Sequence, residues 1–323
     1  MNSANEVKNA VSAGKTIFLV PHINPDGDSV ASVFALKKII DLNFEGKTVI
    51  PVLRYKGKNP LPFLNGIEAG KDFDEVAQIK PDTVIAVDVA AKDRLSDMLS
   101  VFENTENTIN IDHHKTNPLF GKYNYVKPEL CSAGAVLYDF CKEAGLKIND
   151  DIAADLYVSI LSDTGGFRHD NTTAETFSTA AELAKFDINP TLLYRKTLEQ
   201  GSKESVLFSA YAISRAEFAF KDKVAYSVIT IEDMKKFNAL NEHTDSVAET
   251  LRKIKSVDVA FTVKELENGF SKVSLRSKTV DVSKIAEIFD GGGHERAAGC
   301  VIKKPYITAC NKLLEYLENA VTE

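Results

Sequence analysis

Short, unbroken apolar runs recur along the first half of the chain and alternate with segments of helical spacing. The runs are residues 16–20 (TIFLV), 49–53 (VIPVL), 83–87 (TVIAV) and 108–111 (TINI). After the first run, Val30, Phe34 and Ile39 have the spacing of a helix, for which we predict Ser29 as the cap. Apolar strands alternating with helices are typical of a parallel sheet covered on both faces. We therefore predict an α/β N-terminal domain in which helices flank a parallel sheet.

Further helices are predicted later in this half, over residues 132–140 and 150–161. The second ends at a polar segment, residues 162–166 (SDTGG). Thr172 and Glu175 have the spacing of a capping box that would begin another helix. These helices complete the set that we expect to cover the sheet.

The second half of the chain has a different pattern, which predicts a smaller α+β domain with a mixed sheet. Its predicted strands are residues 224–230, 257–263 and 272–276, and its predicted helices are 244–254, 282–289 and 306–317. Asn268-Gly269, between the last two strands, is the strongest short signal for a hairpin. We place the first domain at residues 1–186, a linker at 187–205 and the second domain at 206–323.

Composition and charge restrict the class of protein. The chain has 323 residues and a net charge of −7, without the basic excess of proteins that track along nucleic acid, so we expect no long duplex as a partner. No apolar run approaches the roughly 18 residues that span a bilayer, so we expect a cytoplasmic protein with no membrane partner. The four cysteines lack CxxC spacing and are expected to be buried apolar residues.

Acidic and imidazole side chains follow the predicted strands, at the points where these strands end. His22, Asp26 and Asp28 follow the first strand, Asp88 follows the third, and Asp112, His113 and His114 follow the fourth. Ligands of open parallel sheets bind outside the carboxyl ends of the strands, so we expect these groups to meet at one edge. Asp163 lies at the predicted C-terminus of a helix, where the helix dipole disfavours a carboxylate unless a cation is nearby.

Several kinds of site can be weighed for these residues. Asn24, Asp26 and Asp28 imitate the start of a calcium loop, but Ser29 and Ala35 stand where that loop needs Gly and Glu. A plain turn and a pair of surface histidines remain open. Four carboxylates in one site would repel one another unless two divalent ions neutralised them. Carboxylates with imidazoles and no cysteine suit Mn²⁺ first, with Mg²⁺ or Fe²⁺ as alternatives.

Taken together, these segments resemble the four metal motifs of the DHH phosphoesterase superfamily. The motifs are His22-x-x-x-Asp26-x-Asp28, Asp88, Asp112-His113-His114 and Asp163-Thr164-Gly165-Gly166, in that order. Residues 274–278 (SLRSK) and 291–299 (GGGHERAAG) resemble the DHH-associated C-terminal domain. The similarity covers nearly the whole chain. In chain length and in the order of its motifs, the sequence resembles the subfamily of nanoRNases and 3′-phosphoadenosine-5′-phosphate phosphatases.

The resemblance implies a role for each of these residues. It implies one metal ion held by His22, Asp26 and Asp88, and a second held by Asp28, Asp88, His113 and Asp163. It implies that His114 faces the scissile phosphate and that Asp112 orients a neighbouring group. It also implies substrate binding by Arg276, Ser277, Gly292, Gly293 and His294. Arg94 would either support a phosphate or form a surface ion pair. Asp290 stands where the family often has Gly, and we expect this departure to change the local charge without loss of activity.

The function implied is that of a two-metal phosphoesterase acting on short nucleotides. We expect hydrolysis of short oligoribonucleotides, linear or cyclic dinucleotides, or 3′-phosphoadenosine-5′-phosphate to mononucleotides, with Mn²⁺ preferred over Mg²⁺. An inorganic pyrophosphatase or polyphosphatase is the alternative among enzymes, and a nucleotide sensor without catalysis is the alternative outside them. The sequence leaves open which nucleotide is physiological and whether the chain forms a homodimer.

Overall fold

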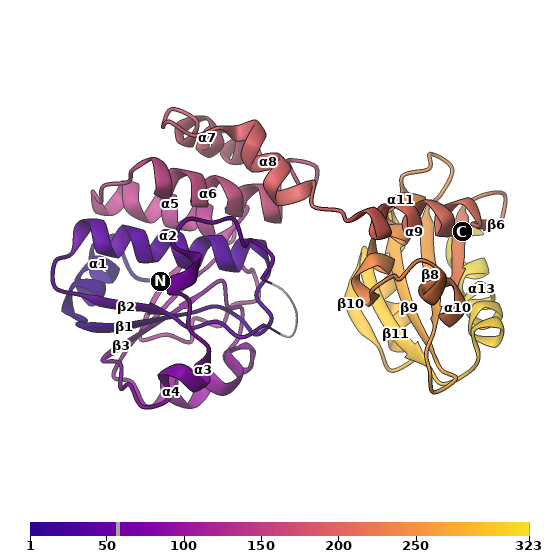
Figure 1. Cartoon of the computed structure of the whole chain (residues 1–323), viewed down its shortest axis with the longest axis horizontal. Coiled ribbons are helices and arrows are strands. Elements are labelled where there is room, and N and C mark those ends of the chain that lie inside the picture. The colour runs from indigo at the N-terminus through magenta and orange to yellow at the C-terminus, as the bar shows by residue number, and fades with distance from the viewer. Residues whose placement is uncertain (56–58, 323) are drawn as a thin grey trace. The chain divides into compact units, whose positions relative to one another are not determined.

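Five parallel strands form the sheet of the N-terminal part of the chain, in the order β2-β1-β3-β4-β5 (Figure 1). They are β1 (Thr16–Val20), β2 (Thr48–Pro51), β3 (Thr83–Val87), β4 (Asn107–Asp112) and β5 (Tyr123–Val126). The computed structural model describes residues 1–55 and 59–322 and divides the chain into two units, Met1–Gln200 and Gly201–Glu323. The predicted α/β fold with a parallel sheet is confirmed.

Helices cover both faces of this sheet. The helices of this unit are α1 (Ala4–Ala13), α2 (Gly27–Asn43), η1 (Ile67–Ala69), α3 (Phe73–Val76), η2 (Lys92–Met98), α4 (Leu99–Glu103), α5 (Ala133–Ala144), α6 (Asp150–Asp163), α7 (Ala174–Leu183) and α8 (Pro190–Leu198), of which α7 and α8 pack against other helices. Ile17 and Leu19 of β1 pack in one core with α1, α2, α5 and α6, whereas Phe18 and Val20 pack in the other with η2 and α4. Alternate strand residues face opposite sides, so a sheet covered on both faces needs continuous apolar strands.

Local hydrogen bonding moves two of the predicted helix starts. The cap of α2 is Asp26, whose carboxylate accepts a hydrogen bond from the Ser29 backbone, so the predicted Ser29 cap is wrong. Helix α7 is capped by Thr173, which pairs with Thr176, and not by the predicted box of Thr172 and Glu175. In both cases the helix begins close to the predicted residue. The cap is the residue whose side-chain oxygen accepts a hydrogen bond from the first turn, Asp26 for α2 and Thr173 for α7.

The C-terminal unit is built on a six-stranded mixed sheet in the order β10-β11-β9-β8-β7-β6. Its elements are α9 (Lys203–Ser214), β6 (Glu217–Ala219), β7 (Val224–Ile229), α10 (Ile231–Lys236), η3 (Asn241–Thr244), α11 (Asp245–Arg252), β8 (Val259–Glu265), β9 (Ser271–Ser277), α12 (Val282–Glu287), β10 (Gly292–His294), β11 (Ala297–Ile302) and α13 (Tyr306–Thr322). Strands β8 and β9 form the predicted hairpin, in which Gly269 has a positive φ of 74°. Two glycines of the segment 291–299, Gly292 and Gly293, lie in the edge strand β10, which pairs with β11.

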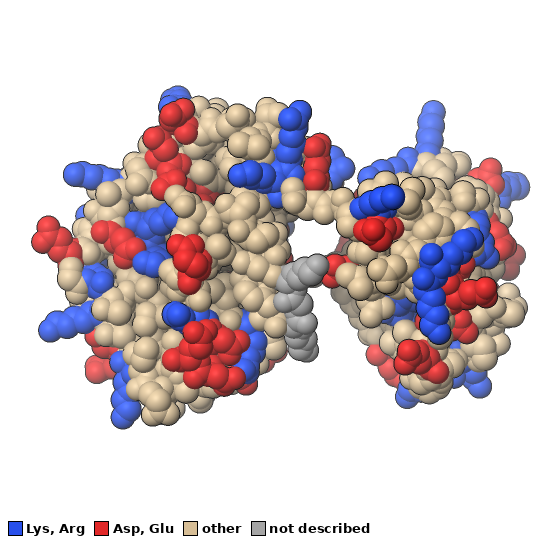
Figure 2. All heavy atoms as spheres, in the orientation of Figure 1, with Lys and Arg blue, Asp and Glu red and all other residues tan. Residues whose placement is uncertain are grey.

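Surface charge is mixed on the drawn face of each unit. Figure 2 shows lysine and arginine side chains interspersed with aspartate and glutamate over the face drawn. The four cysteines are buried and free, as predicted. Among the described residues, no helix has both the length and the apolar character needed to cross a membrane.

Candidate active site

The predicted acidic and imidazole residues of the N-terminal unit meet at the carboxyl ends of β1, β3 and β4 and at the C-terminus of α6. Their possible ligand atoms form three groups, and within each group these atoms lie within 4.8 Å of one another. The groups are His22 with Asp26 and Asp88, Asp28 with His113 and Asp163, and Asp88 with Asp112, His113 and His114. Parallel strands end at the same edge, and α6 brings Asp163, at its C-terminal end, to the same place. All eight residues therefore belong to one cluster.

Asp88 lies at the centre of this cluster. Its Oδ1 is 3.5 Å from His113 Nε2 and 3.6 Å from His114 Nδ1, while its Oδ2 is 3.8 Å from His22 Nε2. The Ser29 hydroxyl donates a hydrogen bond to Oδ2, but the buried Oδ1 has no hydrogen-bond partner among the described residues. A buried carboxylate oxygen without a partner is costly, and a cation is the group that fits between it and the imidazoles.

Asp28 is buried beside Asp88 and accepts hydrogen bonds from three donors. Its Oδ1 accepts hydrogen bonds from the hydroxyls of Ser32 at 3.0 Å and Ser159 at 2.5 Å, and its Oδ2 accepts one from the Ala133 backbone at 2.9 Å. Burial, with further contributions from Asp88 and Asp163, raises the pKa of Asp28 well above its usual range. Desolvation and like charge both oppose ionisation here, so positive charge in the site would be strongly bound.

The pKa values of His113 and Asp163 are also raised, which again shows that the site favours added positive charge. Burial lowers the pKa of His113, but the neighbouring carboxylates of Asp88 and Asp28 outweigh it and raise this pKa to about 10. Burial raises the pKa of Asp163 to about 6, in spite of His113. The Asn171 side chain donates a hydrogen bond to Asp163 Oδ2 at 2.8 Å and thereby orients this carboxylate.

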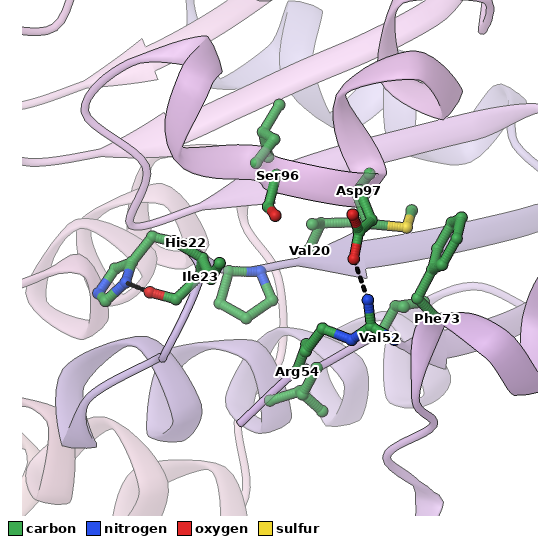
Figure 3. A pocket seen from close by; sticks show the side chains of 12 residues that line it. Val20, His22, Ile23, Val52, Arg54, Phe73, Ser96 and Asp97 are labelled. Carbon is green, nitrogen blue, oxygen red and sulfur yellow. Dashed lines mark hydrogen bonds and ion pairs between the residues drawn. The ribbon is translucent and has the colours of Figure 1, made fainter. Parts of the chain in front are cut away.

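His22 has the arrangement expected of a metal ligand. Its Nδ1 lies 2.9 Å from the Ile23 carbonyl oxygen (Figure 3), and its Nε2 lies 3.8 Å from carboxylate oxygens of both Asp26 and Asp88. A hydrogen bond from Nδ1 to the carbonyl would leave the lone pair of Nε2 directed at these carboxylates. Arg94 places Nη2 3.2 Å from the same Nδ1, so its guanidinium lies beside the cluster.

The pocket drawn in Figure 3 borders His22 on the side of β2 and η2. It has a volume of about 20 Å³, and its walls include Val52, Phe73 and Ser96, with the ion pair of Arg54 and Asp97 beside them. This volume holds about one water molecule. The pocket is therefore too small for a nucleotide base.

His114 is held by a chain of hydrogen bonds behind the cluster. Its Nδ1 lies 2.7 Å from Asp112 Oδ1, and Asn117 donates to Asp112 Oδ2 at 2.5 Å and to Asn110 at 2.7 Å. The hydrogen bond with Asp112 raises the pKa of His114. Burial raises the pKa of Asp112, but the hydrogen bond and charge of His114 lower it by a larger amount, so the pKa lies below its usual value. The His114 side chain is 41% exposed, against 14% for His113, and is thus the more exposed of the two imidazoles.

In the C-terminal unit, the predicted binding residues lie on β9 and β10. The strand register places Arg276 opposite Ala297 and Ala297 opposite His294, so Arg276 and His294 share one row across three strands. Gly292, Gly293 and His294 are exposed. Ser277 is buried, and its hydroxyl donates to the Val280 carbonyl at 2.5 Å, so it serves the fold of its own turn.

Comparison with known proteins shows which protein family has this architecture. The DHH family N-terminal domain matches residues 16–160, and the DHHA1 domain matches residues 221–323. A Streptococcus mutans protein, named a probable bifunctional oligoribonuclease and PAP phosphatase NrnA, is 32% identical over 289 residues, which cover 90% of each chain. The chain belongs to the DHH family.

Other relatives of this DHH protein also match over most of its length. The bifunctional oligoribonuclease and PAP phosphatase NrnA of Thermus thermophilus is 29% identical, over 94% of this chain and 88% of that protein. The crystal structure of an exopolyphosphatase-related protein from Bacteroides fragilis superposes with a TM-score of 0.89 at 22% identity, covering 99% of this chain and 97% of that one. This second likeness shows a shared fold across both units.

Several polar groups of the DHH site were not predicted from the sequence. The hydroxyls of Ser29, Ser32 and Ser159 hold Asp88 and Asp28, and the amides of Asn117 and Asn171 hold Asp112 and Asp163. The sequence signal was present in α2 and α6, where serines interrupt otherwise apolar helix faces. A serine in an apolar face needs a buried partner, and a nearby carboxylate is such a partner.

Proposed function

We propose that this DHH protein is a divalent-metal phosphoesterase that hydrolyses short oligoribonucleotides and 3′-phosphoadenosine-5′-phosphate to mononucleotides. The observation that carries the proposal is the buried Asp88 Oδ1, which lies in the cluster of imidazoles and carboxylates without a hydrogen-bond partner among the described residues. The relatives named NrnA support the substrate class, because they match along both units.

The residues present fit two divalent ions. We assign His22, Asp26 and Asp88 to one ion and Asp28, Asp88, His113 and Asp163 to the other, with Mn²⁺ preferred because the ligands are carboxylates and imidazoles. When bound, such a pair neutralises the carboxylates, polarises phosphoryl oxygens and activates water. The hydrogen bonds from Ser29 and Asn171 then keep Asp88 and Asp163 oriented toward the site.

The remaining roles concern the substrate. His114 would donate a hydrogen bond to an oxygen of the scissile phosphate, with Asp112 holding its ring in place. In the DHHA1 domain, Arg276 and His294 would bind the distal phosphate and base, and the backbone of Gly292 and Gly293 would allow close approach. Asp290 precedes the glycine run at a φ of 55°, a conformation that aspartate tolerates, so this departure from glycine leaves the turn intact.

An activity panel tests the proposal. The full chain, with Mn²⁺ or Mg²⁺, is assayed on a diribonucleotide, a cyclic dinucleotide, 3′-phosphoadenosine-5′-phosphate and pyrophosphate. We expect turnover of the nucleotides with Mn²⁺, at least about tenfold faster than turnover of pyrophosphate, a difference of about 1.4 kcal/mol in activation free energy. Faster hydrolysis of pyrophosphate would favour the pyrophosphatase alternative. Binding of nucleotides without turnover would favour a sensor.

A further inference from the structure

A set of fully buried serine hydroxyls lies beneath the carboxylates of the site. Ser32 comes from α2, Ser132 caps α5 and Ser159 comes from α6, and none of the three is exposed to solvent. We call Ser32, Ser132 and Ser159 the serine cluster. Burying a hydroxyl is costly unless it is hydrogen-bonded, so three of them at a helix junction require an explanation.

Ser159 is at the centre of the serine cluster. Its Oγ lies 2.5 Å from Asp28 Oδ1, 2.9 Å from Ser132 Oγ and 3.4 Å from Ser32 Oγ, and it accepts a hydrogen bond from the Gly134 backbone at 2.9 Å. A hydroxyl has one proton to donate, and a carboxylate is its strongest acceptor here. The proton of Ser159 is therefore assigned to Asp28.

The two oxygens of Asp28 are used differently as a result. Oδ1 accepts from the hydroxyls of Ser159 and Ser32, whereas Oδ2 accepts from the Ala133 backbone and lies 3.6 Å from His113 Nε2. With Oδ1 engaged on the buried side, the carboxylate cannot rotate without breaking two hydrogen bonds. Oδ2 is thereby kept toward the imidazole.

We propose that Ser159, assisted by Ser32, is a positioning residue that orients Asp28 for metal binding. This inference rests on the proposed function, in which Asp28 is a ligand. Partners of this kind orient the ligand before the ion arrives, and their loss weakens metal binding although they never touch the ion. The alternative is that the serine cluster only joins three helices, in which case its loss would affect stability alone.

Gly134 shows how tightly the position of the Ser159 hydroxyl is set. A Cβ atom at position 134 would collide with Oγ of Ser159 and would lie 2.5 Å from its Cβ and 3.2 Å from the Leu156 carbonyl oxygen. Helix α5 therefore needs glycine here, because the space of a side chain is already filled from α6. A side chain at position 134 would therefore occupy the space that the Ser159 side chain now fills.

Calorimetric titration of Mn²⁺ into the metal-free full chain tests the proposal. We expect Ser159→Ala to bind Mn²⁺ about 10- to 100-fold more weakly than wild type at the Asp28 ion. The matched control is Thr83→Val, because Thr83 is equally buried at the opposite end of β3 and its hydroxyl contacts Asp82 and Asn107. Both variants should lose stability, but only Ser159→Ala should lose Mn²⁺ affinity.

A rescue experiment separates positioning from helix packing. In the double variant Ser159→Gly with Gly134→Ser, the hydroxyl is supplied from α5 in place of α6, and we expect most of the Mn²⁺ affinity to return. If Ser159→Ala does not fold, Ser32→Ala replaces it, since Ser32 donates to the same oxygen of Asp28. If wild type binds Mn²⁺ and the folded serine variant binds it equally tightly, the inference is overturned. Absence of Mn²⁺ binding by wild type would instead overturn the proposed function.

Discussion

At Asp88 the backbone has a φ of 59°, in the left-handed region that aspartate and asparagine tolerate better than other side chains with a Cβ. This conformation follows directly on β3 and turns the carboxylate into the site, where Oδ1 faces His113 and His114. One residue therefore combines a strained backbone, a buried charge and a central position. Such a combination is typical of functional residues, where the surrounding structure stabilises the strain.

Asp88→Asn is consequently a sharper test than a change to alanine, which would also destabilise the left-handed turn. We expect turnover to fall by at least about a thousandfold, or about 4 kcal/mol, because the amide cannot bridge two cations. The metal-free variant should unfold at a temperature no lower than that of metal-free wild type, because the repulsion between carboxylates is relieved.

The control for this variant is Asp74→Asn, an exposed aspartate paired with Arg54. It should retain wild-type turnover, because a surface ion pair contributes little to either stability or the site. Retention of about a tenth of wild-type activity by Asp88→Asn at saturating Mn²⁺ would correspond to a loss of only about 1.4 kcal/mol and would contradict the bridging role.

Helices α2 and α6 are joined at a second buried polar contact, away from the site. Lys38 Nζ of α2 lies 2.7 Å from Asp155 Oδ2 of α6, and the Asp155 side chain is almost fully buried. Burial raises the pKa of Asp155 to about 7, although Lys38 opposes this shift. Desolvation thus exceeds the attraction of the ion pair, as it often does for buried pairs.

This raised pKa predicts a pH dependence of stability. The unfolded chain releases the Asp155 proton near the ordinary aspartate pKa of 3.8 and the folded chain near 7, so between these values the folded state binds more protons. The contribution of Asp155 to stability is therefore greatest at low pH, falls as the pH rises toward 7 and is constant above it. Asp155→Asn removes this titration.

Denaturant unfolding of wild type and Asp155→Asn at several pH values measures the effect. The difference in free energy of unfolding should shift in favour of the asparagine variant by on the order of 1 kcal/mol per pH unit between about pH 5 and 7. Groups that titrate equally in both proteins cancel in this comparison. A difference that does not change with pH would show that Asp155 ionises normally in the folded chain.

Over the whole molecule, charge limits the substrates that can bind. The net charge is −7, and Figure 2 shows basic and acidic side chains mixed on the face drawn. The positive groups that we assign to substrate are the two ions and the row of Arg276 and His294. Each nucleotide beyond these would add a negative charge that faces a protein of net negative charge.

We therefore expect short substrates to be preferred. Dinucleotides to pentanucleotides should exceed 24-mers in kcat/KM by at least about tenfold, equivalent to about 1.4 kcal/mol. The comparison uses 5′-labelled RNAs at equal molar ends, near physiological salt and with saturating Mn²⁺. Hydrolysis of the 24-mer at the rate of the dinucleotide would contradict the short-substrate preference and would indicate a single-strand exonuclease.

Much of the fold was predictable, because burial on both faces of a parallel sheet leaves a direct trace in the sequence. The runs 16–20 and 83–87 coincide with β1 and β3, and Ser132 caps α5 at the start of the predicted helix. Helix α1 and strand β5 were not predicted, because each mixes polar with apolar residues. The glycine run lacks the side chains of a strand, and its pairing partner β11 is visible only in the folded sheet.

The sequence by itself determined which chemical groups could form the site and in what order along the chain they occur. Strand ends carry His22, Asp88 and the residues 112–114, and parallel strands end at one edge, so their meeting follows from the fold class. Tertiary structure alone decided how those groups are held. Whether Ser159 reaches Asp28 depends on how closely α6 packs against α2 and α5, and Gly134 permits that approach. Helical periodicity records which face is buried, but not which atom of another helix the face will meet.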